Sequence, residues 1–199
     1  MEIRIKSNDR VLIAGKTGSG KSYWIKKVMA SLDSFIFYDP KNNHTELTYP
    51  TSNNLDNLIK LIQKGNKKVV FRPMRPDNDI FDNLCKFVYF LQNTTLIIDE
   101  CIFHVSSNKI LPWHETLMTN GRTRNIGVWN CTQRPRNIVH NTLISESEHI
   151  IVFNLKLETD RQKLADSFDE LILKANELER FHYIYFNERE DKAEIMPPI

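Results

Sequence analysis

The stretch LIAGKTGSGKSYWIKKV, Leu12–Val28, decides the fold. An apolar run leads into a glycine-rich loop, and a helix is expected after the loop. The pattern G-x-x-x-x-G-K-[ST] is met by Gly15, Gly20, Lys21 and Ser22. In such a loop the backbone N–H groups turn inward around a phosphate, and the dipole of the following helix favours negative charge. The stretch therefore predicts a strand, a phosphate-binding loop and a helix, but not what a bound nucleotide would drive.

The loop predicts both a nucleotide and a metal ion. Lys21 is expected to reach the β- and γ-phosphates, and the Ser22 hydroxyl is expected to ligate Mg²⁺. ATP and Mg²⁺ are thus the expected cofactors. The residues expected to hold the nucleotide are Gly15, Lys16, Thr17, Gly18, Ser19, Gly20, Lys21 and Ser22.

The stretch TTLIIDE, Thr94–Glu100, is a second informative segment. Its apolar residues predict a buried strand that delivers two carboxylates to the carboxyl edge of a sheet, beside the glycine-rich loop. Asp99 is expected to hold Mg²⁺ through water. Glu100 is well placed to polarise an attacking water as a general base. A water-activating glutamate favours hydrolysis over phosphate transfer to a substrate.

A third segment, NGRTRNIGVWNCTQRP, covers Asn120–Pro135. Its apolar strand ends in a polar pair that includes Gln133. If this strand lies between the strands bearing the glycine-rich loop and Asp99, Gln133 would face the γ-phosphate or the lytic water and sense hydrolysis. Arg122 and Arg124 precede the strand, too far from their own nucleotide to act on it. In a ring, one of them could act as an arginine finger on the neighbour's γ-phosphate, and Arg124 is favoured.

Composition narrows the classes of protein further. The chain has 199 residues, 41% of them hydrophobic and 26% charged, as expected for a globular protein. A net charge of +2 neither demands nor excludes nucleic acid, although a ring would multiply a few basic residues. Cys85, Cys101 and Cys131 are widely spaced, which argues against a disulfide framework or a structural zinc site. With no apolar leader and no run of 18 apolar residues, we expect no signal peptide or membrane span and a cytoplasmic location.

Strand-like runs alternate with helix-length segments along the chain, which predicts βαβ crossovers and a parallel sheet. We expect a single α/β domain over residues 1–199, with three layers and a mainly parallel central sheet. The expected strands are Arg10–Gly15, Ser34–Pro40, Lys67–Pro73, Thr94–Glu100, Asn125–Gln133, Glu148–Leu155 and a more exposed Arg180–Glu190. The expected helices are Lys21–Ser31, Asn54–Gly65, Asp77–Gln92, part of Pro112–Thr119, and Leu157–Phe168.

In this order, GKTGSGKS, YDPK, LIIDE and GRTRNIGVWNCTQRP resemble the FtsK–HerA superfamily of DNA-pumping ATPases. The chain is most similar to the genome-packaging ATPases of viruses with double-jelly-roll capsids. The most specific part is R-x-x-G followed by a strand ending in T-Q-[RK], here Arg124, Gly127, Thr132, Gln133 and Arg134. The resemblance covers about two-thirds of the chain and implies a RecA-like P-loop ATPase fold of the type with an additional catalytic glutamate.

The resemblance also implies an activity and partners. The chain would be an ATP-hydrolysing motor that moves double-stranded DNA through a homo-oligomeric ring of five or six copies and packages a viral genome. Capsid or vertex proteins would be further partners, in the host cytoplasm or associated with the virion. Lys109, Arg134 and Arg136 lie in loops that could face DNA in the pore, where phosphate contacts need only charge and reach.

Two alternatives remain at this point. A P-loop phosphotransferase acting on a small molecule would need an arginine-rich lid and an acceptor pocket, and neither is evident in the sequence. An ATPase of conjugation, DNA repair or plasmid partition would share the same motifs.

Overall fold

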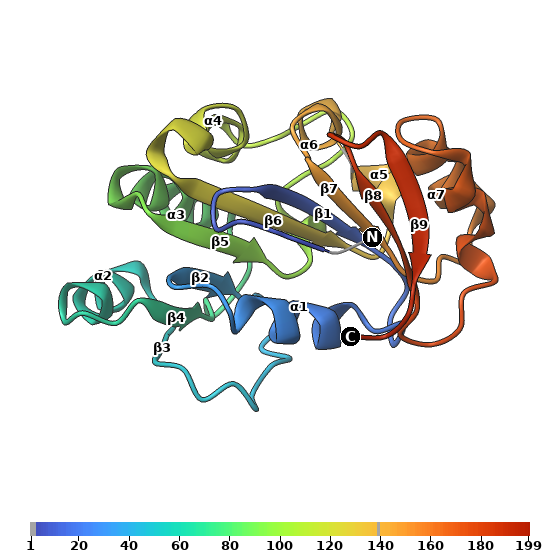
Figure 1. The fold of residues 1–199 in the computed structure, drawn as a ribbon. Coiled ribbons are helices and arrows are strands. Elements are labelled where there is room, and N and C mark those ends of the chain that lie inside the picture. Colours follow the sequence, from blue (N-terminus) through green and yellow to red (C-terminus); the bar gives the residue numbers. More distant parts are fainter. Residues whose placement is uncertain (1–2, 139) are drawn as a thin grey trace.

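The computed structural model describes residues 3–138 and 140–199, and these residues form one nine-stranded sheet (Figure 1). The strand order is β3-β4-β2-β5-β6-β1-β7-β8-β9. All pairings from β3 through β7 are parallel, whereas β8 and β9 extend one edge in antiparallel fashion. The expected mainly parallel sheet is confirmed, and the single-domain expectation stays a prediction.

The elements follow the expected alternation closely. The strands are β1 (Arg10–Ala14), β2 (Phe35–Tyr38), β3 (Thr51–Ser52), β4 (Lys68–Phe71), β5 (Thr94–Ile98), β6 (Ile126–Thr132), β7 (His149–Val152), β8 (Tyr183–Asn187) and β9 (Lys192–Met196). The helices are α1 (Lys21–Met29), α2 (Leu55–Gln63), α3 (Asn78–Leu91), α4 (Pro112–Asn120), α5 (Pro135–Ile138), α6 (Asn141–Ser145) and α7 (Glu158–Ala165). Three 3₁₀ helices complete them: η1 (Cys101–Phe103), η2 (Gly121–Arg124) and η3 (Glu170–Asn176).

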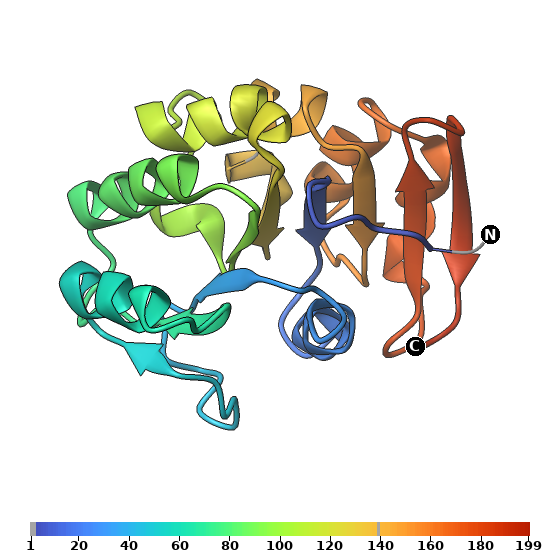
Figure 2. The same cartoon turned by 60° about the vertical axis from the view of Figure 1, so that its left-hand side comes forward.

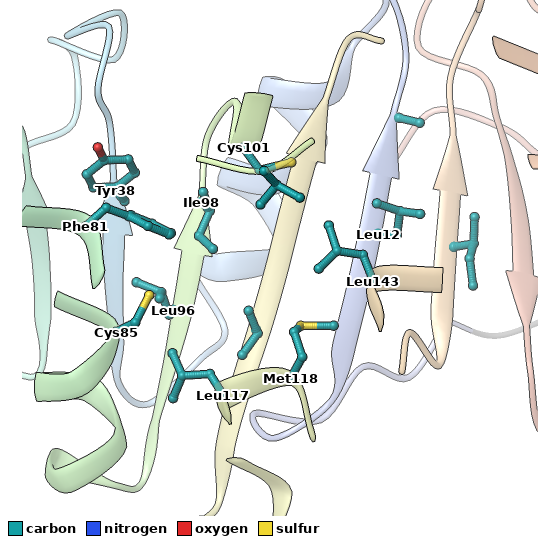
Figure 3. Packing of buried hydrophobic residues seen from close by; sticks show 14 of the residues in the cluster. Leu12, Tyr38, Phe81, Cys85, Leu96, Ile98, Cys101, Leu117, Met118 and Leu143 are labelled. Carbon is teal, nitrogen blue, oxygen red and sulfur yellow. The ribbon is translucent and has the colours of Figure 1, made fainter. Parts of the chain in front are cut away.

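Helices cover both faces of the sheet, so the core has two halves (Figure 2). Side chains alternate along each strand, so Leu12 of β1 points into one half and Val11 into the other. The larger half packs the sheet against α2, α3, α4, α6 and α7, and Figure 3 shows part of it, including Leu12, Leu96 and Met118. The smaller half lies under α1, where Trp24 is buried against Trp129 of β6. Three layers result, as expected.

Local signals in the sequence explain where the longer helices begin and end. Asn54 caps α2 by accepting a hydrogen bond from the N–H of Asn57, and Asp77 caps α3 in the same way. Gly65 follows α2 with φ of 91°, and its N–H donates to the Ile62 carbonyl. The glycine stop expected for this helix is therefore confirmed.

The first residues of β6 are held by the segment before β1. The Ser7 carbonyl accepts a hydrogen bond from the Thr95 hydroxyl, and the Asp9 carbonyl accepts one from the N–H of Val128. A Cβ on Gly127 would overlap the Ser7 carbonyl oxygen. Gly127, part of the sequence signature, is thus a position where two backbones approach closely.

Three further features complete the description of the fold. All three cysteines are free and buried. Within the described residues, no helix is both long and apolar enough to cross a membrane. Strands β3 and β9 and the short helices α5 and α6 were not expected from the sequence.

Candidate nucleotide-binding and hydrolysis site

The glycine-rich loop connects β1 to α1 at the carboxyl edge of the sheet (Figure 1). Its first residues continue the sheet pairing, because the N–H of Lys16 donates to the Asn154 carbonyl at 2.8 Å. The Lys21 ammonium group turns back into the loop and donates to the carbonyl of Lys16 at 3.0 Å and to that of Gly15. Burial lowers the pKa of Lys21, although nearby Glu100 and Asp99 oppose that shift. A cation is therefore held inside the loop by backbone carbonyl oxygens, a position from which it could instead contact a polyphosphate.

Strand β6 lies between β5 and β1, so the condition placed on Gln133 is met. Gln133 follows β6 and faces the glycine-rich loop. Its Oε1 accepts a hydrogen bond from the Thr17 hydroxyl at 2.7 Å, and its Nε2 donates to Glu100 Oε2. One side chain thus connects the glycine-rich loop to the carboxylate after β5.

Glu100 is 5% exposed and sits in a left-handed backbone conformation, with φ of 68° and ψ of 70°. Its Oε2 also accepts from the Lys41 ammonium group at 3.2 Å. Its Oε1 is buried without a partner among the described residues. A non-glycine residue with this backbone and an unpaired buried oxygen is costly, and such strain is concentrated at functional sites.

Asp99 lies beside Glu100 but is held by a different residue. His44 Nε2 lies 3.0 Å from Asp99 Oδ2, and His44 is itself buried against Phe37. Burial opposes protonation of His44, but the hydrogen bond and charge of Asp99 raise its pKa above the ordinary value. The loop after β2, residues 39–46, therefore contacts both carboxylates, Glu100 through Lys41 and Asp99 through His44.

Asp39 anchors this loop. Its carboxylate is fully buried and accepts from the N–H groups of Asn43 and His44, at 3.0 and 3.2 Å, and from Arg72 Nε at 2.9 Å. Ligand atoms of Asp39, His44 and Asp99 lie within 4.8 Å of one another. Because three N–H donors already occupy Asp39, including a guanidinium, this trio does not fit a separate metal ion. The oxygen donors of Ser22 and Asp99, which line one cavity, do fit Mg²⁺.

These groups line a cavity of about 370 Å³, which is within the range of small-molecule sites. On its walls lie six of the residues that the sequence singled out, namely Thr17, Lys21, Ser22, Asp99, Glu100 and Gln133. Lys41 and His44 also line it and were not expected from the sequence. The only signal was the YDPK stretch, whose polar residues follow an apolar strand.

Arg122 and Arg124 lie at the opposite end of β6 from Gln133. Seven strand residues separate these ends, a span of roughly 20 Å. Arg122 pairs with the buried carboxylate of Glu148 at 2.7 Å, whereas the Arg124 guanidinium stacks over the Tyr89 ring at 4.1 Å. Neither arginine can reach the cavity of its own chain.

The residues considered for DNA contact are exposed, but they do not form one cluster. Arg134 and Arg136 follow β6 at the edge that carries the cavity, and the N–H of Arg136 donates to the Asp160 carboxylate. Lys109 lies in a separate turn before α4, where it bridges to Ser106. All three side chains are exposed to solvent.

No family model and no curated protein matches the chain. Several solved structures, in contrast, match the chain in fold. The genome-packaging NTPase B204 of Sulfolobus turreted icosahedral virus 2, in complex with AMPPCP, matches with a TM-score of 0.82 and 22% identity over 98% of this chain and 100% of that one. VirB4 of Thermoanaerobacter pseudethanolicus matches with a TM-score of 0.70 and 9% identity over 97% and 90%. The pCW3 conjugation coupling protein TcpA matches with a TM-score of 0.64 and 14% identity over 92% and 58%. At these identities the likeness concerns the fold, and it confirms that the chain has the RecA-like P-loop ATPase fold expected from its resemblance to the FtsK–HerA superfamily.

Proposed function

We propose that this chain is an ATP-hydrolysing motor that moves double-stranded DNA and packages a viral genome. One observation carries the hydrolysis part: the hydrogen-bonded path from Thr17 through Gln133 to Glu100. That path joins the phosphate-binding loop to a buried carboxylate through a strand-end amide. Such a connection would let the state of the γ-phosphate be sensed where water is activated.

Nucleotide binding falls to residues Gly15–Ser22. The backbone N–H groups and the Lys21 ammonium group would neutralise the phosphates, and Lys21 would exchange its present carbonyl contacts for phosphate oxygens. Ser22 and Asp99 would hold Mg²⁺, directly and through water respectively. When bound, the ion neutralises developing charge on the phosphates.

Hydrolysis then falls to Glu100 and Gln133. Glu100 would accept a proton from the attacking water, and Gln133 would orient that water against the γ-phosphate. Lys41 and Gln133 both donate to Glu100 Oε2 and hold the carboxylate in place, whereas Oε1 has no partner among the described residues and is the oxygen that would take the proton. The products are ADP and phosphate.

The site of one chain would be completed by a neighbour. Arg124 is a better candidate than Arg122 for the arginine finger that acts on the neighbour's γ-phosphate, because Arg122 is already paired with the buried Glu148. The Arg124 guanidinium lies over the Tyr89 ring and pairs with no carboxylate among the described residues, so its charge can be redirected to a γ-phosphate across a subunit boundary. The proposed assembly is a homo-oligomeric ring of five or six copies.

DNA would lie against Arg134 and Arg136 and against Lys109, which offer exposed charge without base-reading geometry. Packaging is favoured over conjugation by the extent of the structural match. The chain covers the whole of the B204 packaging NTPase but only 58% of the TcpA coupling protein. Capsid or vertex proteins are the proposed further partners, in the host cytoplasm or on the virion.

An ATPase assay with and without double-stranded DNA, together with the native mass, tests the proposal. We expect several-fold stimulation by DNA and a mass of five or six copies on DNA. Glu100→Gln should lower kcat by about 10²- to 10⁴-fold and leave ATP binding intact. DNA-independent transfer of phosphate to a small acceptor by a monomer would instead identify a phosphotransferase.

A further inference from the structure

One wall of the cavity is formed by residues that have no role in the proposed hydrolysis. Glu100 and Gln133 define the end where the γ-phosphate would lie, on the side of β5 and β6. Because a triphosphate is linear, its nucleoside must leave the glycine-rich loop in the other direction. The cavity wall in that direction is formed by Tyr23, Arg180 and Phe181.

This wall is aromatic and partly open. Tyr23 directly follows Ser22 in the first turn of α1, and 41% of its surface is exposed. Its ring centroid lies 5.4 Å from that of Phe181, with the rings tilted by 58°. The Arg180 guanidinium lies 4.7 Å above the Phe181 ring. Two rings and a planar cation beside a phosphate site offer faces on which a planar base can stack.

Backbone and packing contacts with the glycine-rich loop fix the position of Phe181 in this wall. The N–H of Phe181 donates to the Ser19 carbonyl at 3.0 Å, which ties the segment before β8 to the phosphate-binding loop. Phe181 has φ of 69°, a left-handed conformation that is costly for an aromatic residue. A Cβ on Gly20 would come within 2.9 Å of the Phe181 ring, so this ring lies directly against the loop. The strain and the close packing fix one ring beside the nucleotide cavity.

We propose that Tyr23, Phe181 and Arg180 form a base-stacking subsite that holds the nucleobase of the triphosphate by its faces. The inference rests on the proposed nucleotide site and goes further by assigning base recognition. Stacking tolerates any base, because every base has a π face. The described residues of this wall offer rings and one exposed guanidinium, with no buried amide or carboxylate to read a base edge. ATP and GTP are therefore accepted alike.

Binding of ATP and of inorganic tripolyphosphate, measured side by side by calorimetry, separates base from phosphate recognition. The wild-type chain should bind ATP more tightly than tripolyphosphate. Tyr23→Ala should weaken ATP binding about tenfold and leave tripolyphosphate binding unchanged, because stacking is lost and the loop is not. Tyr23→Phe, which keeps the ring face, should bind ATP as the wild type does. Phe90→Ala, an exposed ring on α3 away from the cavity, is the matched control and should change neither affinity.

The possible results distinguish failure of the stacking subsite from failure of the nucleotide site as a whole. If the wild type binds ATP and tripolyphosphate equally well, or if Tyr23→Ala weakens both equally, the stacking subsite is wrong while the phosphate site stands. If the wild type binds neither, the proposed nucleotide site fails and the subsite with it. A preference for ATP over GTP of more than about a hundredfold would overturn recognition by faces alone, because edge contacts are needed for discrimination of that size.

Discussion

Asp39→Asn tests the loop that contacts Glu100 and Asp99, the two carboxylates of the candidate site. Asp39 accepts three hydrogen bonds, one of them from the Arg72 guanidinium, and is fully buried. An asparagine of the same shape has one acceptor oxygen, so its NH₂ group must face a protein N–H. The variant also leaves the charge of Arg72, whose side chain is only 15% exposed, without its carboxylate partner. Hydrogen bonds to charged groups contribute about 1.5–3 kcal/mol each, so a loss of about 3 kcal/mol is expected.

Thermal unfolding and steady-state hydrolysis measure the two consequences. For a chain of this size, a loss of about 3 kcal/mol corresponds to a Tm lower by roughly 6–12 °C. Below the new Tm, kcat should also fall, because Lys41 and His44 move with the loop and no longer hold Glu100 and Asp99 in position. The control is Asp33→Asn, which changes an exposed carboxylate and should leave both values unchanged. If Asp39→Asn unfolds within about 2 °C of the wild type, the anchoring argument is refuted.

Three other predictions concern packing, titration and the shared site. Gly127→Ala should lower stability by about 2–4 kcal/mol in urea unfolding, because the new methyl group overlaps the Ser7 carbonyl. Burial lowers the pKa of His114 from 6.5 to about 4, so its neutral form is favoured in the fold and stability is lost as pH falls from 6.5 towards 4. The contribution of His114 to the free energy of unfolding should therefore be about 2 kcal/mol smaller at pH 5 than at pH 8. Mixtures of Arg124→Ala and Glu100→Gln chains should regain ATPase activity that neither has alone, since one can supply the arginine and the other the glutamate.

A separate result would contradict each of these three predictions. Gly121→Ala is the control for packing, since its Cβ would meet no atom closer than 3.4 Å, and equal losses at both glycines would remove the close-approach argument. A His114→Gln chain with the same pH dependence as the wild type would show that another group titrates. Mixed rings that form and stay inactive would count against a finger supplied in trans.

The residues near the glycine-rich loop could be predicted because their signals are local. A strand, a loop and a helix in sequence place Lys21, and an apolar run places Asp99 and Glu100 at the strand end. Gln133 required one further assumption, the position of β6 between β5 and β1, which the structure meets. Parallel strands bring their carboxyl ends to one edge, so the assembly of these residues follows from topology.

The contacts of His44 and Lys41 could not be predicted in the same way. They join residues 55 and 59 positions apart through a loop whose path depends on Asp39 and Arg72. Strand β9 was missed because it is an edge strand, whose alternation is too weak to separate it from a loop. The pairing of Arg122 with Glu148 likewise depends on tertiary packing, and it distinguishes two arginines that the sequence left open.

Hydrolysis at Glu100 is proposed to drive movement along double-stranded DNA. Displacement of a third strand from a DNA triplex measures that movement directly, because the oligonucleotide is released only when a motor runs into it. We expect release that needs ATP and is abolished by Glu100→Gln, although that variant still binds ATP and DNA. Hydrolysis of ATP in the presence of the triplex with no release of the third strand would show that the chain does not move along DNA.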